Sequence, residues 1–377
     1  MNHNPYNFIE QQIYSWLCRK FVSSSVRRVS DLPVALASDI GIQRKENQDR
    51  LLVMRFKSAS DNSDVMLIVL ADGMGGMIGG ADAASIALSS FSWGVINEYS
   101  GINESIDECL RKSVNYANSR VYDKYKGEGG ATLSAIIMNN NGIIRGLNVG
   151  DSRIYSLSNT SIEQLTEDDT IAALAQKYKI NDSPVADGFG RELVQYVGQE
   201  VPIEAHLINF SDGNINKIII TSDGAHVIGD ENIFKLSKGG ANSAVLSKRV
   251  IELANWFGGV DNASIATIDI QENYKSSVDT EINVIQLWDA FGELRIACDI
   301  NSIKKTQEIN PRSDLISPVL TKEEEEELIK KRDLKLRNIN KRTTKTSKRN
   351  IKAKEKTKER DEQVNINFGG GEKKDDE

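Results

Sequence analysis

Short runs of β-forming apolar residues occur in groups along residues 36–270, with helical stretches between the groups. The predicted strands lie at 51–56, 65–71, 132–138, 143–149, 153–158, 217–222 and 264–270, and the predicted helices at 81–99, 105–125 and 243–257. Strands in groups, without strict alternation of strand and helix, are typical of α+β folds. We therefore expect a four-layer αββα sandwich, in which two antiparallel sheets are flanked by helices.

Four aspartates stand where a predicted strand meets a polar turn: Asp49, Asp72, Asp223 and Asp261. Side chains at strand ends are positioned by a rigid scaffold and can converge. Carboxylates are hard oxygen ligands, which suit Mg²⁺ or Mn²⁺ rather than zinc. The pattern therefore indicates a divalent-metal active site.

The composition excludes several classes of protein. The 377 residues are 39% hydrophobic and 27% charged, which is ordinary for a globular protein. No apolar run reaches about 18 residues, so we expect no transmembrane segment. The 3 cysteines are widely spaced, which favours a reducing cytoplasm over a disulfide framework. The 3 histidines form no zinc-ligand pair, and a phosphate-binding P-loop motif is absent.

Charge is distributed unevenly along the chain. The net charge is −7, yet residues 301–377 carry 21 Lys and Arg against 16 Asp and Glu. An acidic body is expected of a protein that gathers carboxylates around metal ions. The basic stretch 341–360 has no aromatic residue for base stacking. Binding of a partner or nucleic acid and a merely solvated tail are therefore both open interpretations of this stretch.

The chemistry of two metal ions assigns a role to each carboxylate. A pair of divalent ions roughly 3.5–4 Å apart can share a carboxylate and activate a water for attack on phosphorus. Asp72 is the candidate bridging ligand, and the carbonyl of Gly73 can approach a metal because glycine has no side chain. Asp223 and Asp261 would complete one metal's ligands. Asp49 would act through a water or as a second ligand.

Arg44 is the candidate phosphate-binding residue, because its planar guanidinium matches two phosphate oxygens. The alternative is a surface ion pair with Glu46. Asp151, in a turn between two predicted strands, is a plausible ligand for a further, weaker metal. Arg153 is interpreted as structural. Asp168 and Asp169 are expected to cap a helix that begins near residue 171.

Seven ordered blocks resemble the metal-dependent serine/threonine protein phosphatases of type 2C, particularly their bacterial branch. The blocks contain Asp39 with Arg44 and Asp49, Asp72–Gly76, Gly130–Leu133, Asn148–Arg153, Leu165–Asp168, Thr221–Gly224 and Gly259–Asn262. The resemblance implies two Mn²⁺ or Mg²⁺ ions and a third, weakly bound ion near Asp151. It assigns phosphate binding to Arg44, metal ligation to Asp72, Gly73, Asp223 and Asp261, and water-mediated ligation to Asp49. It also makes residues 167–199 a flap beside the catalytic cleft.

The chain departs from the family pattern at three places. Gln48 stands where the family often has Glu before the first metal-site aspartate, so the affinity for one metal would fall. Met74 and Met77 stand where many members have a histidine, and Asp169 replaces the histidine of the flap motif. These departures keep a second hypothesis open: a weakly active or inactive phosphoprotein-binding scaffold of the same fold, with a basic tail for a partner or nucleic acid.

The segments outside the matching region suggest a domain organisation. We expect an amphipathic leader helix within 1–33, the phosphatase domain at 34–272, an appended β-hairpin at 273–300 and a charged tail at 301–377. The leader helix and the hairpin strand region 279–298 are candidate docking sites for a partner protein. The leading hypothesis is a cytoplasmic phosphatase that hydrolyses phosphoserine and phosphothreonine in the protein substrates of a serine/threonine kinase.

Overall fold

The computed structural model describes residues 6–58, 61, 63–99, 103–177, 189–210, 214–238, 242–270 and 284–297. The predicted charged tail and residues 273–283 of the predicted hairpin segment lie outside these ranges. Within the described residues, no helix combines the length and apolar character needed to cross a membrane.

Two antiparallel sheets form the centre of the molecule. One sheet has the strand order β1-β2-β11-β10-β7-β8, and the other has the order β13-β12-β3-β4-β5-β6-β9. The strands are β1 (Ser24–Arg28), β2 (Val34–Asp39), β3 (Asp49–Lys57), β4 (Asp64–Asp72), β5 (Leu133–Asn139), β6 (Ile144–Val149), β7 (Arg153–Leu157), β8 (Ile162–Gln164), β9 (His206–Asn209), β10 (Lys217–Thr221), β11 (Ala263–Asp269), β12 (Val284–Trp288) and β13 (Glu293–Ala297).

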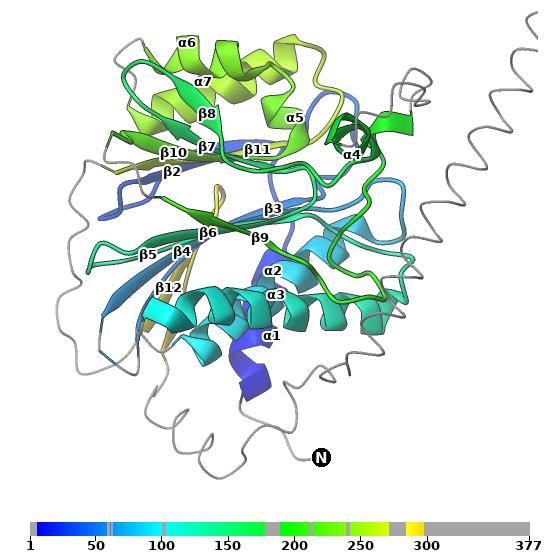
Figure 1. Ribbon diagram of the computed structural model, residues 1–377, viewed down its shortest axis with the longest axis vertical. Coiled ribbons are helices and arrows are strands. Elements are labelled where there is room, and N and C mark those ends of the chain that lie inside the picture. Colours follow the sequence, from blue (N-terminus) through cyan, green and yellow to red (C-terminus); the bar gives the residue numbers. More distant parts are fainter. Residues whose placement is uncertain are drawn as a thin grey trace, which may run out of the picture.

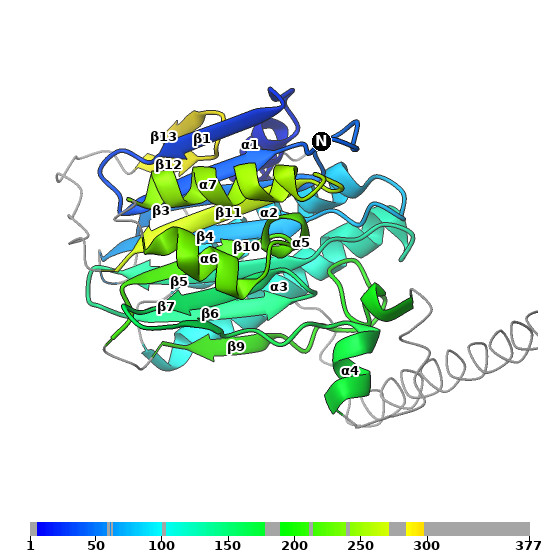
Figure 2. The same ribbon diagram turned by 90° about the horizontal axis from the view of Figure 1, so that it is seen from above.

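Helices cover both outer faces of the paired sheets, so the expected αββα sandwich is confirmed (Figure 1). The helices are α1 (Tyr6–Leu17), α2 (Gly80–Glu98), α3 (Asn103–Tyr125), α4 (Ile171–Lys177), α5 (Asp223–His226), α6 (Asp230–Ser237) and α7 (Ser243–Trp256). The first three lie under the seven-stranded sheet, and the last three lie over the six-stranded sheet. Figure 2 shows that the strands of the two sheets run in similar directions, as in aligned sheet packing.

The central strands are apolar on both faces because each face packs against a different layer. In β4, Leu67 and Val69 face the helices, whereas Met66 and Ile68 face the other sheet. Successive side chains of a strand point to opposite faces, so a strand buried on both sides reads as a continuous apolar run. This explains why the sequence predicts β3 and β4 clearly.

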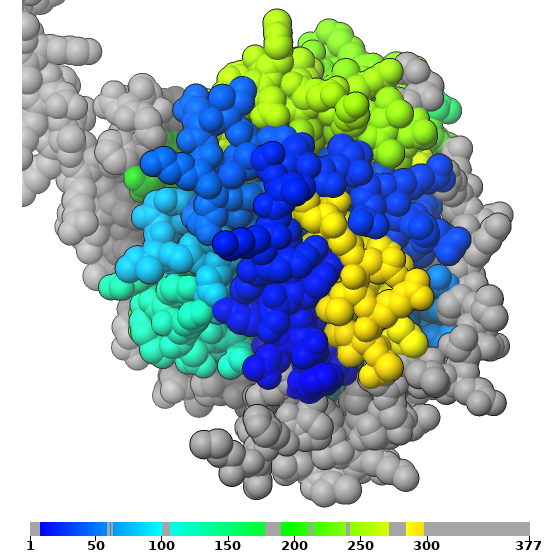
Figure 3. Space-filling model, turned by 180° about the vertical axis from the view of Figure 1, so that it is seen from behind, coloured from blue at the N-terminus to red at the C-terminus, as the bar shows by residue number. Residues whose placement is uncertain are grey.

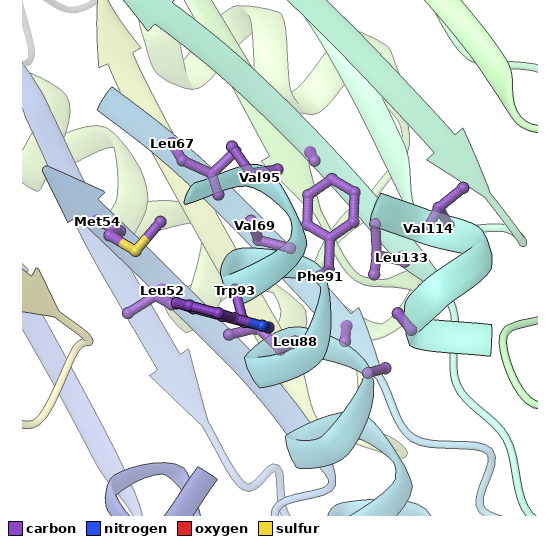
Figure 4. Close-up of a cluster of buried hydrophobic side chains, with 14 of the residues drawn as sticks. Leu52, Met54, Leu67, Val69, Leu88, Phe91, Trp93, Val95, Val114 and Leu133 are labelled. Carbon is purple, nitrogen blue, oxygen red and sulfur yellow. The ribbon is translucent and has the colours of Figure 1, made fainter. Parts of the chain in front are cut away.

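The packing of α2 on the sheet follows from helical spacing. Figure 4 shows Phe91 and Val95, one turn apart, turned toward Leu67 and Val69 of β4 and Leu133 of β5. Residues four apart lie on one face of a helix. All five side chains are fully buried.

The N-terminal segment and the β12–β13 hairpin close one edge of the sandwich together. They lie side by side on the surface in Figure 3. Arg19 forms a 2.5 Å ion pair with Asp289, and the rings of Phe21 and Phe291 stack with centroids 4.8 Å apart. The strand β12 also extends the sheet by pairing with β3.

Several elements were not expected from the sequence. The strands β1, β2, β8 and β9 and the helices α5 and α6 fall in segments without a clear periodic pattern. Asp223 begins the single-turn helix α5, although we expected a polar turn there. Edge strands such as β1, in which exposed and half-buried residues alternate, carry little apolar signal.

Candidate active site

The four aspartates singled out in the sequence lie at one end of the sandwich. β3 begins at Asp49 and β4 ends at Asp72, and these two residues pair directly opposite each other in the antiparallel register. β10 ends at Thr221, two residues before Asp223, and β11 begins two residues after Asp261. Since β10 and β11 are also antiparallel, both chain reversals fall at the same end.

Hydrogen bonds join the two sheets at this end. The hydroxyl of Ser222, after β10, donates to Oδ2 of Asp49 on the other sheet at 2.8 Å. The same hydroxyl oxygen accepts a bond from the backbone N–H of Ser264. Asp72 and Asp223 also lie close enough for each carboxyl to influence the pKa of the other. The acidic groups of the two sheets therefore form one cluster.

Burial and mutual repulsion raise the pKa values of the clustered carboxyls. Burial raises the pKa of Asp49 to about 7, with a further contribution from Asp223 and Asp261, although bonds from Ser264 and Ser222 oppose the shift. Burial raises the pKa of Asp72 well above its usual range, and the nearby Asp49 and Asp223 raise it further. The cluster is short of compensating positive charge.

Asp151 lies at the margin of this cluster, between β6 and β7. Burial raises its pKa to about 7, and the charges of Asp223 and Asp168 add to the shift. The preceding Gly150 has a φ of 96°, a backbone conformation that favours glycine. Asp151 therefore sits within the electrostatic field of the four aspartates.

Gly73 cannot carry a side chain in this fold. A Cβ atom at this position would lie 2.2 Å from the carbonyl oxygen of Gly80 and 3.0 Å from that of Gln48. The two ends of the loop 73–80 are therefore pressed together beside Asp72. This close approach is the structural reason for a glycine after the aspartate.

Arg44 is an ion-pair partner of the acidic cluster rather than of Glu46. Its Nη2 lies 2.6 Å from Oδ2 of Asp261, and the Arg44 side chain is 39% exposed. A cation and a carboxylate thus meet at the solvent edge of the buried cluster. The arrangement leaves the guanidinium accessible to an incoming anion.

Gln48 and Asn262 brace the loop that carries Arg44. The Asn262 amide accepts a bond from the backbone N–H of Gln48 at 2.8 Å and donates to the carbonyls of Ile40 and Glu46. The Gln48 side chain lies against Gly80, where an added Cβ would be 3.0 Å from the Gln48 amide carbon. Asn262 was part of a sequence block, but its bracing role could not be predicted because its partners are over 200 residues away.

The prediction that Asp168 and Asp169 cap α4 is wrong. Thr170 caps the helix instead, because its hydroxyl accepts a bond from the N–H of Ala173. Asp168 forms a two-pronged ion pair with Arg153, a contact that agrees with the structural interpretation of Arg153.

Asp169 accepts several hydrogen bonds in the segment that the sequence predicts as a flap. It accepts bonds from the N–H of Gly150, from Gln195 and from His206 at 2.9–3.0 Å. The described residues of the segment 167–199 are thereby joined to the loop before Asp151. Arg191 also contributes, since its charge lowers the pKa of Asp223. Arg191 carried no sequence signal, because it lies far from the motifs.

The donor set fits hard divalent cations. Asp49 Oδ1 and Asp223 Oδ1 are buried acceptors that have no hydrogen-bond partner. A buried acceptor without a hydrogen-bond partner destabilises the fold unless a ligand binds to it. Among the described residues, however, no three His, Cys, Asp or Glu side chains already stand in a metal-binding arrangement. The carboxylates lie near one another without the geometry of a metal site, and Asp261 is paired with Arg44.

An αββα sandwich with buried carboxylates at one end defines a class of metal-dependent phosphatases. A family model described as protein phosphatase 2C matches residues 42–266, more than half of the chain. The chain therefore belongs to the protein phosphatase 2C family, whose members are serine/threonine protein phosphatases.

Individual relatives agree with this assignment. The serine/threonine phosphatase stp of Listeria welshimeri is 27% identical over 244 residues, which cover 62% of this chain and 93% of that protein. The serine/threonine protein phosphatase PstP of Mycobacterium tuberculosis is 28% identical over 247 residues, but the match covers only 45% of that longer protein.

Solved structures of similar proteins share the fold. The serine/threonine phosphatase of S. agalactiae is 26% identical, with a TM-score of 0.54, and the match covers 63% of this chain and 99% of that one. The phosphatase PstP/Ppp of Mycobacterium tuberculosis is 25% identical, with a TM-score of 0.51, and the match covers 66% and 100%. The family match excludes α1, β1, β2, β12 and β13.

Proposed function

We propose that this chain hydrolyses phosphoserine and phosphothreonine in proteins at a centre of two Mn²⁺ or Mg²⁺ ions. The observation that carries the proposal is the gathering of buried, mutually repelling carboxylates with unpartnered oxygens beside an accessible arginine. Asp72, Asp223, Asp261 and the Gly73 carbonyl would hold the ions, and Asp49 would act at one remove. Asp151 would help to hold a third ion.

The ions, when bound, would supply Lewis acidity that lowers the pKa of water toward about 7 and neutralises charge on the phosphoryl group. The protein would hold the carboxylates and the guanidinium in fixed positions. Asp49 and Asp72, fixed opposite each other on adjacent strands, define the floor of the site. Asp261 cannot serve Arg44 and a cation equally well with the same oxygen, so cation binding would release the guanidinium for phosphate.

Arg44 would orient the substrate. Its planar donor fork matches two phosphate oxygens, and its place at the solvent edge lets a phosphorylated side chain reach it. Many family members have a histidine where this chain has Met74 and Met77, and His226 lies three residues after Asp223. Burial lowers its pKa to about 3, and Thr221 bonds its Nδ1 atom. His226 is therefore neutral at physiological pH and unsuited to protonate a leaving group.

The direct test is phosphate release from a phosphothreonine peptide by the full-length protein. Release should require Mn²⁺ or Mg²⁺ and should stop when a chelator is added. Release that continues at the same rate in excess chelator would exclude the proposed centre. Inorganic phosphate should inhibit, because it would occupy Arg44.

A weakly active scaffold is the second candidate function. The observations that favour it are the uncharged Gln48 beside the site and the Arg44–Asp261 ion pair, both of which oppose cation binding. Calorimetric titration with Mn²⁺ discriminates the two functions. An enzyme should bind at least two ions per chain, whereas a scaffold need bind none.

A further inference from the structure

An exposed apolar surface adjoins the acidic cluster. Four large apolar side chains lie on the loop after β2, at the last residue of α7 and on the loop that follows α7: Ile42 is 69% exposed, Trp256 82%, Phe257 51% and Val260 48%. Ile42 is two residues from Arg44, and Val260 directly precedes Asp261. We call these four residues the apolar rim.

Backbone contacts hold the two loops together as one surface. The N–H groups of Ile42 and Gln43 both donate to the carbonyl of Gly259, at 2.8 and 3.1 Å. A Cβ atom on Gly41 would lie 2.2 Å from the carbonyl oxygen of Asp261, so the loops also touch at the cluster itself. The loops meet at the end of the sandwich that carries α5 (Figure 1).

The aromatic pair at the end of α7 is unusual for a solvent-facing position. The rings of Trp256 and Phe257 pack edge to face, with centroids 6.2 Å apart. Aromatic side chains supply much of the binding energy of protein interfaces, and clustered exposed apolar groups mark interaction sites. Isolated exposed apolar residues need no such explanation, but here Ile42 and Val260 lie beside the residues of the Arg44–Asp261 pair, and Trp256 and Phe257 precede the same loop.

We propose that the apolar rim binds the residues that flank the phosphorylated side chain, and so selects phosphoproteins with apolar residues beside the phosphoserine or phosphothreonine. This inference rests on the proposed function. An extended chain advances about 3.3–3.6 Å per residue. A substrate whose phosphate reaches Arg44 must therefore run its neighbouring residues across the surface next to Arg44. That surface includes Ile42 on one loop and Val260 on the other.

The test uses the full-length protein with Mn²⁺ and three substrates. Two phosphothreonine peptides differ only in their flanks, with leucines on both sides in one and serines in the other. The third substrate is para-nitrophenyl phosphate, which has no flanking residues. We expect a higher kcat/KM for the leucine peptide than for the serine peptide. The double variant Trp256→Ser and Phe257→Ser should reduce this preference about tenfold.

The matched control is Val245→Ser, which removes an exposed apolar side chain from the opposite end of α7. The control should keep the wild-type preference. An equal loss of activity on all three substrates in the double variant would mean damage to the fold or the centre and would overturn the proposal. A wild-type protein with no preference would overturn it too, as would dimers that depend on Trp256, detected by sedimentation.

The proposed function can fail separately. If the wild-type protein hydrolyses none of the three substrates with Mn²⁺ or Mg²⁺, the phosphatase proposal fails. Fluorescence anisotropy of the two labelled peptides then still tests whether the apolar rim binds apolar flanking residues. Tighter binding of the leucine peptide, lost in the double variant, supports the rim, and equal binding of both peptides overturns it.

Discussion

At the scale of single residues, the charged carboxyls of the candidate site destabilise the metal-free fold. Asp49 is buried and Asp72 is half-buried directly opposite it, and burial together with the neighbouring carboxylates raises the pKa of both. Functional sites commonly hold groups that a stable fold would avoid.

Replacing Asp49 with Asn should stabilise the metal-free protein at neutral pH. The pKa of Asp49 is about 7 in the folded state against 3.8 ordinarily, so its protonated form favours folding. That contribution is complete below about 3.8 and is lost as the pH rises toward 7. In urea unfolding with chelator, the Asp49→Asn gain should grow from pH 4 to pH 8 and reach about 1 kcal/mol. A gain that is independent of pH would contradict a burial penalty.

Arg44→Lys should weaken substrate binding while the fold is retained. A lysine keeps the charge but loses the planar fork that matches two phosphate oxygens. Steady-state kinetics on a phosphothreonine peptide should show a KM raised about tenfold. An Arg44→Lys protein with an unchanged KM would mean that the guanidinium does not hold the phosphate.

At the scale of elements, the leader helix α1 is tied to the first turn of α2. Asp82 accepts bonds from Tyr14 of α1 and from Lys124 and Tyr125 of α3, each at 2.5 Å. Burial raises the pKa of Asp82, but these three bonds outweigh it and lower the pKa. The Tyr125 ring also packs against Gly79, at the end of the loop that begins with Gly73.

Tyr14→Phe should therefore lower the free energy of unfolding by about 1 kcal/mol, the typical contribution of a hydrogen bond. Thermal unfolding should show a decrease of about 2 °C. Tyr122→Phe is the control, because the Tyr122 ring packs by Lys126 instead. Equal losses in both variants would mean that the Asp82 contact contributes nothing of its own.

The pairing of His206 with Asp169 should make the stability of the flap region depend on pH. The bond to Asp169 raises the pKa of His206, which burial only partly opposes; Glu167 raises it further and Lys177 lowers it. A raised folded pKa gives stability that is complete below about 6.5 and is lost as the pH rises through the folded value. His206→Gln should therefore cost more stability at pH 5.5 than at pH 8.5, measured by urea unfolding. The reverse order would show that His206 is not protonated against Asp169.

Long strands with a continuous apolar run could be predicted from the sequence, whereas the shorter strands β2 and β9 could not. β4 reads as a continuous apolar run because two different cores cover it, whereas β9 has four residues and one buried side chain. Local sequence carries little of the pairing that specifies such edge strands.

The same limit applies to the site. Motifs indicated Asp49, Asp72, Asp223 and Asp261, because each follows or precedes a strong strand signal. The residues that hold these aspartates in place could not be predicted, because Ser222, which donates to Asp49, is 173 residues away in the sequence. The capping prediction for Asp168 and Asp169 failed for a related reason: their ion-pair and hydrogen-bond partners come from other elements.

At the scale of the whole molecule, the sandwich brings together the ends of the two sheets that carry the four aspartates. α1, β1 and the β12–β13 hairpin lie outside the family match yet pack onto the shared core. β1 and β13 are the outermost strands of the two sheets, so they are the edge strands on this side of the molecule. The active-site end remains accessible at Arg44 and the apolar rim.

Phosphate release from a phosphothreonine peptide by Asp72→Asn in Mn²⁺ decides whether the acidic cluster is the catalytic centre. Asp123→Asn, an exposed aspartate of α3, is the matched control. We predict a rate at least about a hundredfold below wild type for Asp72→Asn, since even indirect ligand partners contribute about 10–100-fold. Its thermal stability in chelator should be no lower than that of the wild type, and Asp123→Asn should keep the wild-type rate. A wild-type rate of phosphate release by Asp72→Asn would contradict a catalytic role for the acidic cluster.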